Sequence, residues 1–268
     1  MRRYQPLNPD DIGVIPVAKG SLISVDRVRL VSTKGNIELT VGADTEGVLH
    51  ILTGTSITEV SGPWGRRTLC NLGERMNVFS GLPTSVAVKP FSRIRLESSS
   101  RYLDCLWVTA KVEKDLPAVP SVIRHQDVQV HEIGEGYSKR IVRECVGGLG
   151  ITTNLRVGET LSPVGCWSSW PHHEFDTTPN ISDKFEEFSL YFTRPKEGYG
   201  IQIRRGKFSD GRDVDDVFVF RNGESCLIPL GYHPVVSGPE SETLYVWAYV
   251  SPIPKKYAKF ADDVGGYQ

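Results

Sequence analysis

Residues 223–234, GESCLIPLGYHP, decide the predicted fold, because they contain a short apolar strand, a tight turn and a histidine at the start of the next extended segment. An apolar run of this length between Gly223 and Pro229 is typical of a buried strand. Comparable runs recur along the chain, at 23–31, 48–53, 84–89, 93–97, 103–111, 151–157, 185–193, 199–204, 216–220 and 243–250. Many short strands separated by turn residues predict an all-β protein built as a sandwich or barrel.

The domain organisation follows from a break in this pattern near the middle of the chain. Residues 112–126, VEKDLPAVPSVIRHQ, contain two prolines and lose the alternation of the strands, as a surface linker does. Each half also contains a short apolar strand that ends in proline, SVAVKP at 85–90 and SCLIP at 225–229. This weak internal repeat predicts two tandem barrels, at 1–111 and 127–254, with a tail at 255–268.

Composition narrows the class of protein. The 268 residues contain 31 Lys and Arg against 32 Asp and Glu, a net charge of -1, so no footprint for nucleic acid or an anionic membrane is expected. No apolar run approaches the roughly 20 residues of a membrane span, and the start of the chain lacks a signal peptide's apolar stretch. We therefore expect a cytoplasmic protein. The five cysteines form no C-x-x-C pair and are expected to be buried free thiols.

The spacing of Gly223, Pro229, Gly231 and His233 carries the first resemblance to known proteins. It is similar to the second signature of the cupin superfamily, in which the histidine points into the barrel as a metal ligand. Imidazole binds divalent zinc, iron, nickel or copper. The alternative is that His233 has only a structural role in the turn.

Four motifs together resemble the 5-deoxy-glucuronate isomerase family of inositol catabolism, whose relatives include the pectin-pathway uronate isomerases. They are WSSWP at 167–171, EEFSLY at 186–191, GYGIQ at 198–202 and PLGYHP at 229–234. The resemblance covers most of 125–250 and extends more faintly through the first half. It implies an all-β bicupin, two tandem cupin-type jelly-roll barrels, in which the N-terminal barrel is metal-free and the C-terminal barrel holds the metal.

The resemblance implies three metal ligands in the second barrel: His173, Glu187 and His233. The family's second histidine falls on Phe175, which has no ligand atom. His172 replaces it only if the strand is shifted or bulged at Pro171, because consecutive side chains of a strand point to opposite faces. Two histidines and one carboxylate already form a facial set that leaves positions for substrate oxygens. The expected cofactor is a divalent zinc, manganese, iron or nickel ion.

Candidate substrate-binding residues lie on the neighbouring strands. Gln202 and Arg204 share a face, so they are candidates to bind a substrate hydroxyl and a carboxylate, and arginine pairs with carboxylates through two hydrogen bonds. Tyr191 and Tyr245 are the aromatic candidates, because aromatic rings commonly line sugar pockets. The alternatives are a surface charge for Arg204 and core packing for the aromatic residues.

The resemblance implies an aldose–ketose isomerase that converts 5-deoxy-glucuronate into 2-deoxy-5-keto-gluconate. Glu174, Glu186 and Asp176 are the candidates for the base that removes the C2 proton, although Glu186 is also compatible with a solvated surface carboxylate. The small-molecule partner is then a sugar acid, and a homo-oligomer is expected. Because Phe175 replaces a ligand, the alternative is a divergent bicupin that binds a sugar acid or a protein partner without catalysis. A third possibility is altered chemistry, such as a metal-dependent lyase.

Overall fold

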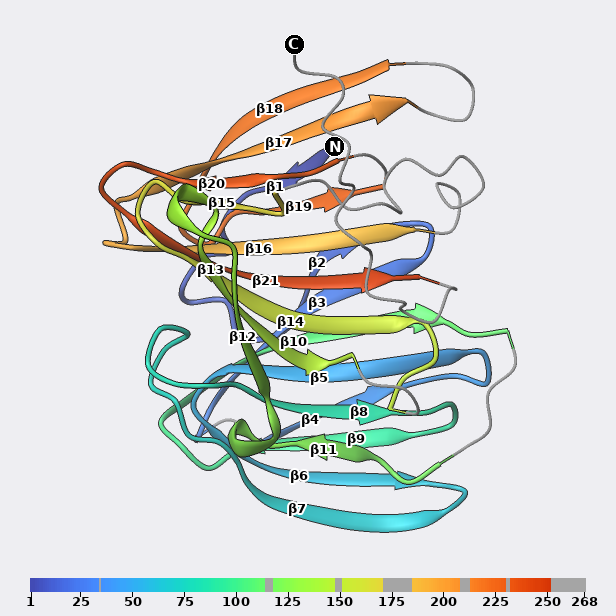
Figure 1. The fold of residues 1–268 in the computed structure, drawn as a ribbon. Helices are drawn as coiled ribbons and strands as arrows, with labels where there is room; N and C mark the ends of the chain where they lie inside the picture. The colour runs from blue at the N-terminus through green and yellow to red at the C-terminus, as the bar shows by residue number, and fades with distance from the viewer. Residues whose placement is uncertain are drawn as a thin grey trace. The chain divides into compact units, whose positions relative to one another are not determined.

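Strands dominate the computed structural model, which describes residues 1–33, 35–113, 118–147, 151–170, 185–207, 213–229 and 232–251. Over these residues no α-helix is found, and the only helical turns are two 3-10 helices, η1 (His125–Asp127) and η2 (Gly136–Ser138). Figure 1 shows the strands gathered into sheets. The prediction of an all-β fold is confirmed.

The chain divides into two compact units. Unit 1 contains Met1–Pro6, Val130–Val142 and Glu159–Gln268, and unit 2 contains Leu7–Gln129 and Arg143–Gly158. These units differ from the predicted barrels at 1–111 and 127–254 in two segments. Met1–Pro6 groups with the C-terminal half of the chain, and Arg143–Gly158 groups with the N-terminal half. The N-terminal residues group with unit 1 because β1 (Arg2–Tyr4) pairs antiparallel with β19 (Ser225–Ile228).

Unit 2 contains a six-stranded and a four-stranded sheet. The six-stranded sheet has the order β11 (Ser121–Ile123), β8 (Thr84–Val88), β5 (Thr45–Thr53), β10 (Tyr102–Lys111), β3 (Ile23–Val31), β2 (Gly13–Lys19). The four-stranded sheet has the order β4 (Asn36–Thr40), β9 (Arg93–Ser98), β6 (Thr55–Gly62), β7 (Gly65–Gly73). Alternate residues of both sheets, among them Leu49, Val60, Leu96 and Trp107, form one buried apolar cluster. This is the interdigitated core of two packed sheets.

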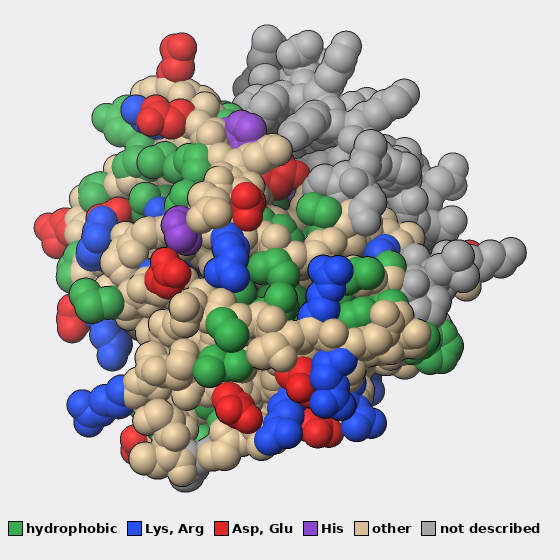
Figure 2. All heavy atoms as spheres, turned by 90° about the horizontal axis from the view of Figure 1, so that it is seen from below, with side chains coloured by type: hydrophobic (Ala, Val, Ile, Leu, Met, Phe, Trp, Pro, Cys, Tyr) green, Lys and Arg blue, Asp and Glu red, His purple; other side chains and the backbone are tan. Residues whose placement is uncertain are grey.

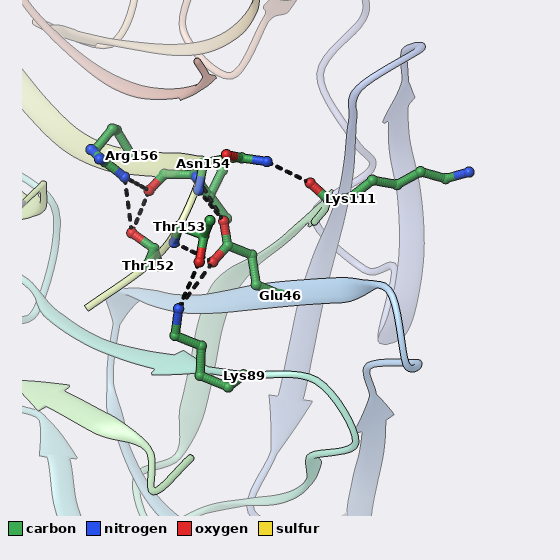
Figure 3. Close-up of polar contacts among 8 residues, drawn as sticks. Glu46, Lys89, Lys111, Thr152, Thr153, Asn154 and Arg156 are labelled. Carbon is green, nitrogen blue, oxygen red and sulfur yellow. Dashed lines mark hydrogen bonds and ion pairs between the residues drawn. The ribbon is translucent and has the colours of Figure 1, made fainter. Parts of the chain in front are cut away.

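Segment 151–158 groups with unit 2 because a buried carboxylate holds it there (Figure 3). Glu46, at the start of β5, is 0% exposed. Its carboxylate accepts backbone N–H groups from Thr153 at 2.6 Å, Asn154 at 2.7 Å and Leu155 at 2.8 Å. Lys89 donates to the Thr153 hydroxyl at 2.9 Å, and its Nζ lies 3.8 Å from Glu46 Oε2. The carboxylate thus satisfies three backbone donors that would otherwise lose hydrogen bonds on burial.

Unit 1 is built around the other two sheets. The seven-stranded sheet has the order β1, β19, β16 (Glu186–Arg194), β21 (Glu242–Val250), β14 (Leu155–Ser162), β13 (Arg140–Val146), β12 (Gln129–Ile133). The four-stranded sheet has the order β15 (Trp167–Ser168), β20 (Val235–Ser237), β17 (Tyr199–Lys207), β18 (Asp213–Arg221). The core between them is markedly aromatic, with Tyr191, Phe218, Phe220, Tyr245 and Trp247 among its members.

The face of the molecule drawn in Figure 2 gives no sign of segregation by charge. Figure 2 shows Lys and Arg intermingled with Asp and Glu over the face that it draws. No helix of the described residues is long and apolar enough to cross a membrane. All five cysteines are free, and four are buried as predicted. The prediction is wrong for Cys70, which is exposed because it lies on β7 at the edge of its sheet.

Candidate functional site

The candidate site lies on the inner face of unit 1, where β16 alternates between two buried faces. Glu187 lies opposite Ile228 of β19 and Tyr249 of β21, and both of these partners belong to the aromatic core. Glu187 therefore points to the same side as Tyr191, four residues further along the strand. Its carboxylate Oε1 accepts a hydrogen bond from the Ser189 hydroxyl at 3.4 Å.

His233 meets Glu187 from the segment that precedes β20. Its Nε2 lies 3.2 Å from Glu187 Oε2, and the two side chains are 3% and 10% exposed. The imidazole also stacks with Phe185, with ring centroids 6.2 Å apart. The structure thus brings together two of the three ligands implied by the resemblance, although they are 46 positions apart in the sequence.

Gln202 holds the segment that carries His233. Its side-chain Nε2 donates to the backbone carbonyls of His233 at 2.9 Å and Pro234 at 3.1 Å, and to that of Ile203 at 2.8 Å. Its Oε1 accepts the Tyr191 hydroxyl at 2.6 Å. Because Gln202 is 0% exposed and both ends of its amide are used, the structure places it as a support for His233.

The hydroxyl of Tyr191 is fixed as a donor in this network. Burial raises the pKa of the Tyr191 phenol well above its usual value, so the proton stays in place and is shared with Gln202. On its other side the hydroxyl lies 3.0 Å from Cys226 Sγ. Burial raises the pKa of the Cys226 thiol to about 12, so it remains a neutral thiol that donates to Tyr191.

Arg204 also points inward, and its guanidinium is bound to a carboxylate of the same unit. Its Nε donates to Asp216 Oδ2 at 3.0 Å, and its Nη2 donates to the same oxygen. The N-terminal ammonium of Met1 lies 3.3 Å from that oxygen. The side chain of Arg204 is only 5% exposed, so the alternative of a plain surface charge is wrong.

Tyr245 lies in the aromatic core of the barrel. Its hydroxyl is 2.6 Å from the Ser168 hydroxyl, and burial raises its pKa. The neighbouring Trp247 donates its indole N–H to Thr160 at 3.0 Å. Ser168 and Cys226 are contributors that the sequence analysis missed. Their places on strands indicate that they point inward, but nothing in the local pattern gives their tyrosine partners.

The remaining predicted site residues divide into two groups. One lies outside the described residues and includes His172, His173, Glu174, Phe175 and Asp176. The other is Glu186, which is 3% exposed, so the solvated-carboxylate alternative is wrong. Its face of β16 also contains Phe188 and Leu190, which are buried as well, and it is opposite to that of Glu187. The structure therefore does not bring Glu186 together with His233.

A complete metal site is not defined by the described part of the chain. Over those residues no group of three His, Cys, Asp or Glu side chains is close enough to hold an ion. Glu187 and His233 nevertheless fit two positions of such a site, because a carboxylate oxygen and an imidazole nitrogen are the ligand types that zinc, manganese and iron take. Their facing atoms are also buried inside the barrel.

The chain forms two barrels, each built from two packed sheets, and the barrel of unit 1 has His233 and Glu187 pointing inward. This arrangement defines a bicupin, and solved structures confirm the fold. An IolB-like protein from Salmonella typhimurium LT2 matches with a TM-score of 0.79 at 21% identity, over 94% of each chain. The oxalate decarboxylase of Lactobacillus farciminis matches with a TM-score of 0.62 at 11% identity, over 94% of this chain and 87% of that one. A Bacillus subtilis oxalate decarboxylase with Mn(II) centres gives 0.54 at 10% identity, over 86% and 69%.

Sequence comparison gives the family directly. The family described as KduI/IolB matches residues 15–265, and the chain belongs to it. A 5-deoxy-glucuronate isomerase from Geobacillus thermodenitrificans is 28% identical over 193 residues, 72% of this chain and 68% of that protein. Another from Listeria innocua is 26% identical over 233 residues, 86% of this chain and 81% of that protein. The resemblance seen in the motifs is confirmed.

Proposed function

We propose that the protein is a metal-dependent aldose–ketose isomerase that converts a deoxy-uronate sugar acid, 5-deoxy-glucuronate, into 2-deoxy-5-keto-gluconate. The observation that carries the proposal is the pairing of Glu187 with His233 inside the barrel of a KduI/IolB family member. The relatives named 5-deoxy-glucuronate isomerase support the substrate.

Glu187 and His233 would hold a divalent ion together with His173. The Mn(II) centres of a bicupin of the same fold support this assignment. When bound, such an ion supplies Lewis acidity toward the carbonyl and hydroxyl oxygens of the sugar. The side chains of Glu187 and His233 are almost completely buried from solvent. The low local dielectric constant strengthens their electrostatic interactions with a bound substrate.

The remaining chemistry belongs to side chains of the same unit. A carboxylate removes the proton from C2 of the aldose and returns it to C1, while the proton of the C2 hydroxyl passes to the C1 oxygen; the aldehyde thereby becomes a hydroxymethyl group and the C2 alcohol a ketone. Of the three candidate bases, Glu186 points away from Glu187, so we propose Glu174 or Asp176. Arg204 is the cation proposed for the uronate carboxylate, and its charge is already aligned by Asp216. Tyr191 and Tyr245 are the proposed aromatic wall.

The experiment that tests this function is a proton NMR assay of the protein with 5-deoxy-glucuronate in D2O. Because a base exchanges protons with solvent, the aldehyde signal is expected to disappear while a deuterated hydroxymethyl group forms. Glucuronate, which keeps its 5-hydroxyl, is the matched control substrate. If the manganese-loaded protein leaves the aldehyde intact while saturation-transfer NMR shows that the sugar acid binds, the isomerase assignment is wrong. The non-catalytic bicupin suggested by Phe175 then replaces it.

A separate prediction concerns the support of His233. Gln202→Glu keeps an oxygen for the Tyr191 hydroxyl but removes the amide donor from the carbonyls of His233 and Pro234, so the affinity for added manganese or zinc is expected to fall about 10–100-fold. Tyr191→Phe is the matched control, since it leaves that donor in place and is expected to keep the wild-type affinity. Metal titration of both variants, with circular dichroism to verify folding, checks this prediction. Unchanged metal affinity in Gln202→Glu together with a raised KM would instead show direct substrate binding.

A further inference from the structure

The outer face of the four-stranded sheet in unit 1 is apolar in a way that the enzymatic function does not explain. Strands β17 and β18 form a long hairpin beside β20, as Figure 1 shows. Its even-numbered residues, such as Gln202 and Phe218, are buried on the inner side, so the odd-numbered residues point outward. We call the outward-pointing apolar set the outer face: Trp167, Tyr199, Ile201, Ile203, Val217, Val219 and Val236.

Strand register makes this outer face continuous. One row crosses all four strands, because Trp167 is paired with Val236, Val236 with Ile201, and Ile201 with Val219. Ile203 and Val217 form the next pair on β17 and β18. Val217 is 59% exposed and Val219 is 40% exposed. In a sheet with one solvated face, apolar residues normally point to the core and polar residues to the solvent. A contiguous apolar band on the outer side therefore indicates a contact surface.

A pocket lies at the β15 end of the outer face. It has a volume of about 340 Å³ and is lined by Tyr137, Ser138, Trp167 and Trp170. Trp167 belongs to both the pocket and the cross-strand row, so the two features are joined. Tyr137 is 80% exposed, and tryptophan and tyrosine are the residue types enriched where protein interfaces bury most of their binding energy.

The free edge of β18 is a poorer docking surface than the face. Arg3 donates from Nη2 to the Val219 carbonyl at 3.2 Å, and its guanidinium lies 4.7 Å from the Phe218 ring centroid. The Arg221 backbone N–H donates a hydrogen bond to Glu224 Oε2 at 2.8 Å. Two backbone groups of this edge strand are therefore already bonded within the chain, which disfavours extension of the sheet by another strand.

Charge placement indicates which partner fits the face. At one end of the hairpin Asp215 pairs with Arg205 at 2.8 Å, and its side chain is 66% exposed. At the other end of β18 lies exposed Arg221. The apolar centre is thus flanked by the Asp215–Arg205 ion pair at one end, of which Asp215 is the more exposed member, and by Arg221 at the other end. A surface with this pattern is self-complementary under a two-fold axis that runs across the strands.

We propose that the outer face is a homodimer interface, in which the valines of β18 pack against those of a second copy. The two-fold relation brings Arg221 of each copy to the partner's exposed Asp215. The partner that binds the outer face is thus a second copy of this chain. The proposal assigns a specific contact surface to the expected homo-oligomer. This inference does not depend on the isomerase activity.

The test measures mass in solution for the full chain by light scattering and sedimentation at micromolar concentration. The wild type is expected to be a dimer or an even multiple of it. Val217→Asp combined with Val219→Asp is expected to halve that mass or reduce it further, with an unchanged circular dichroism spectrum. Val130→Asp is the matched control, because Val130 is 47% exposed on β12 and is expected to leave the mass unchanged.

A charge exchange tests the two-fold arrangement itself. Asp215→Arg and Arg221→Asp are each expected to raise the dimer dissociation constant roughly tenfold, because like charges then face each other. The double variant restores opposite charges across the axis and is expected to recover the wild-type constant. A monomeric wild type, or a Val217→Asp/Val219→Asp variant that retains the wild-type mass, would overturn the interface. Failure of the double variant to recover would overturn the proposed axis.

Discussion

The variant His233→Ala is expected to lose bound metal and to turn over 5-deoxy-glucuronate on the order of 10²–10³ times more slowly than the wild type. The physical reason is that the imidazole lying 3.2 Å from the Glu187 carboxylate is lost, which leaves only Glu187 and His173 of the three proposed ligands, and two ligands hold a divalent ion poorly. Elemental analysis of the untagged protein, together with initial rates from the NMR assay, measures both effects.

The matched control for this prediction is His131→Ala. His131 is an exposed histidine of β12 in the same unit, and its removal is expected to change neither metal content nor rate. A wild type that takes up no metal after incubation with zinc, manganese, iron and nickel would contradict the proposed metal dependence. The evidence would then favour a sugar-acid-binding bicupin.

The largest expected effect on stability comes from Glu46→Ala in unit 2. The substitution removes the acceptor of three backbone N–H groups and leaves the ammonium of Lys89, whose side chain is 12% exposed, without its carboxylate (Figure 3). Removing one partner of a buried charged contact costs about 3–5 kcal/mol in total, because the polar groups that remain lose their partner. We therefore expect the free energy of unfolding to fall by about 3–5 kcal/mol in urea titrations.

The control for the stability measurement is Glu38→Ala. Glu38 lies on β4 and has its carboxylate 3.9 Å from Arg93, with both side chains more than half exposed. Exposed pairs of this kind contribute about 0–1 kcal/mol, so the control is expected to unfold almost as the wild type does. Equal destabilisation by the two substitutions would show that Glu46 has no special role in holding residues 153–155.

The strands that the sequence predicted have a buried face of apolar residues. The run at 103–111 corresponds to β10 (Tyr102–Lys111), and the run at 243–250 corresponds to β21 (Glu242–Val250). The strands that it missed include β7, whose first residues are exposed, and β12, which lies at the end of its sheet. An edge strand can be polar on both faces, so its sequence lacks the alternation that burial imposes on interior strands.

The same distinction holds at the candidate site. The two-residue period of a strand is a local property, so the sequence alone determined that Gln202 and Arg204 share one face. The family motifs determined that His233 belongs with Glu187. The atomic contacts between these side chains could not be predicted from the sequence, because they depend on the register of strands that lie far apart in the chain.

Only the tertiary structure decided the partners of these side chains. It placed the amide of Gln202 against the carbonyl of His233, bound Arg204 to Asp216, and buried Glu186 on the face opposite to Glu187. In unit 2 it placed Glu46 beneath backbone N–H groups more than one hundred residues away. Such contacts arise because buried polar groups must find partners wherever the sheets pack, and the nearest partner in space is seldom near in sequence.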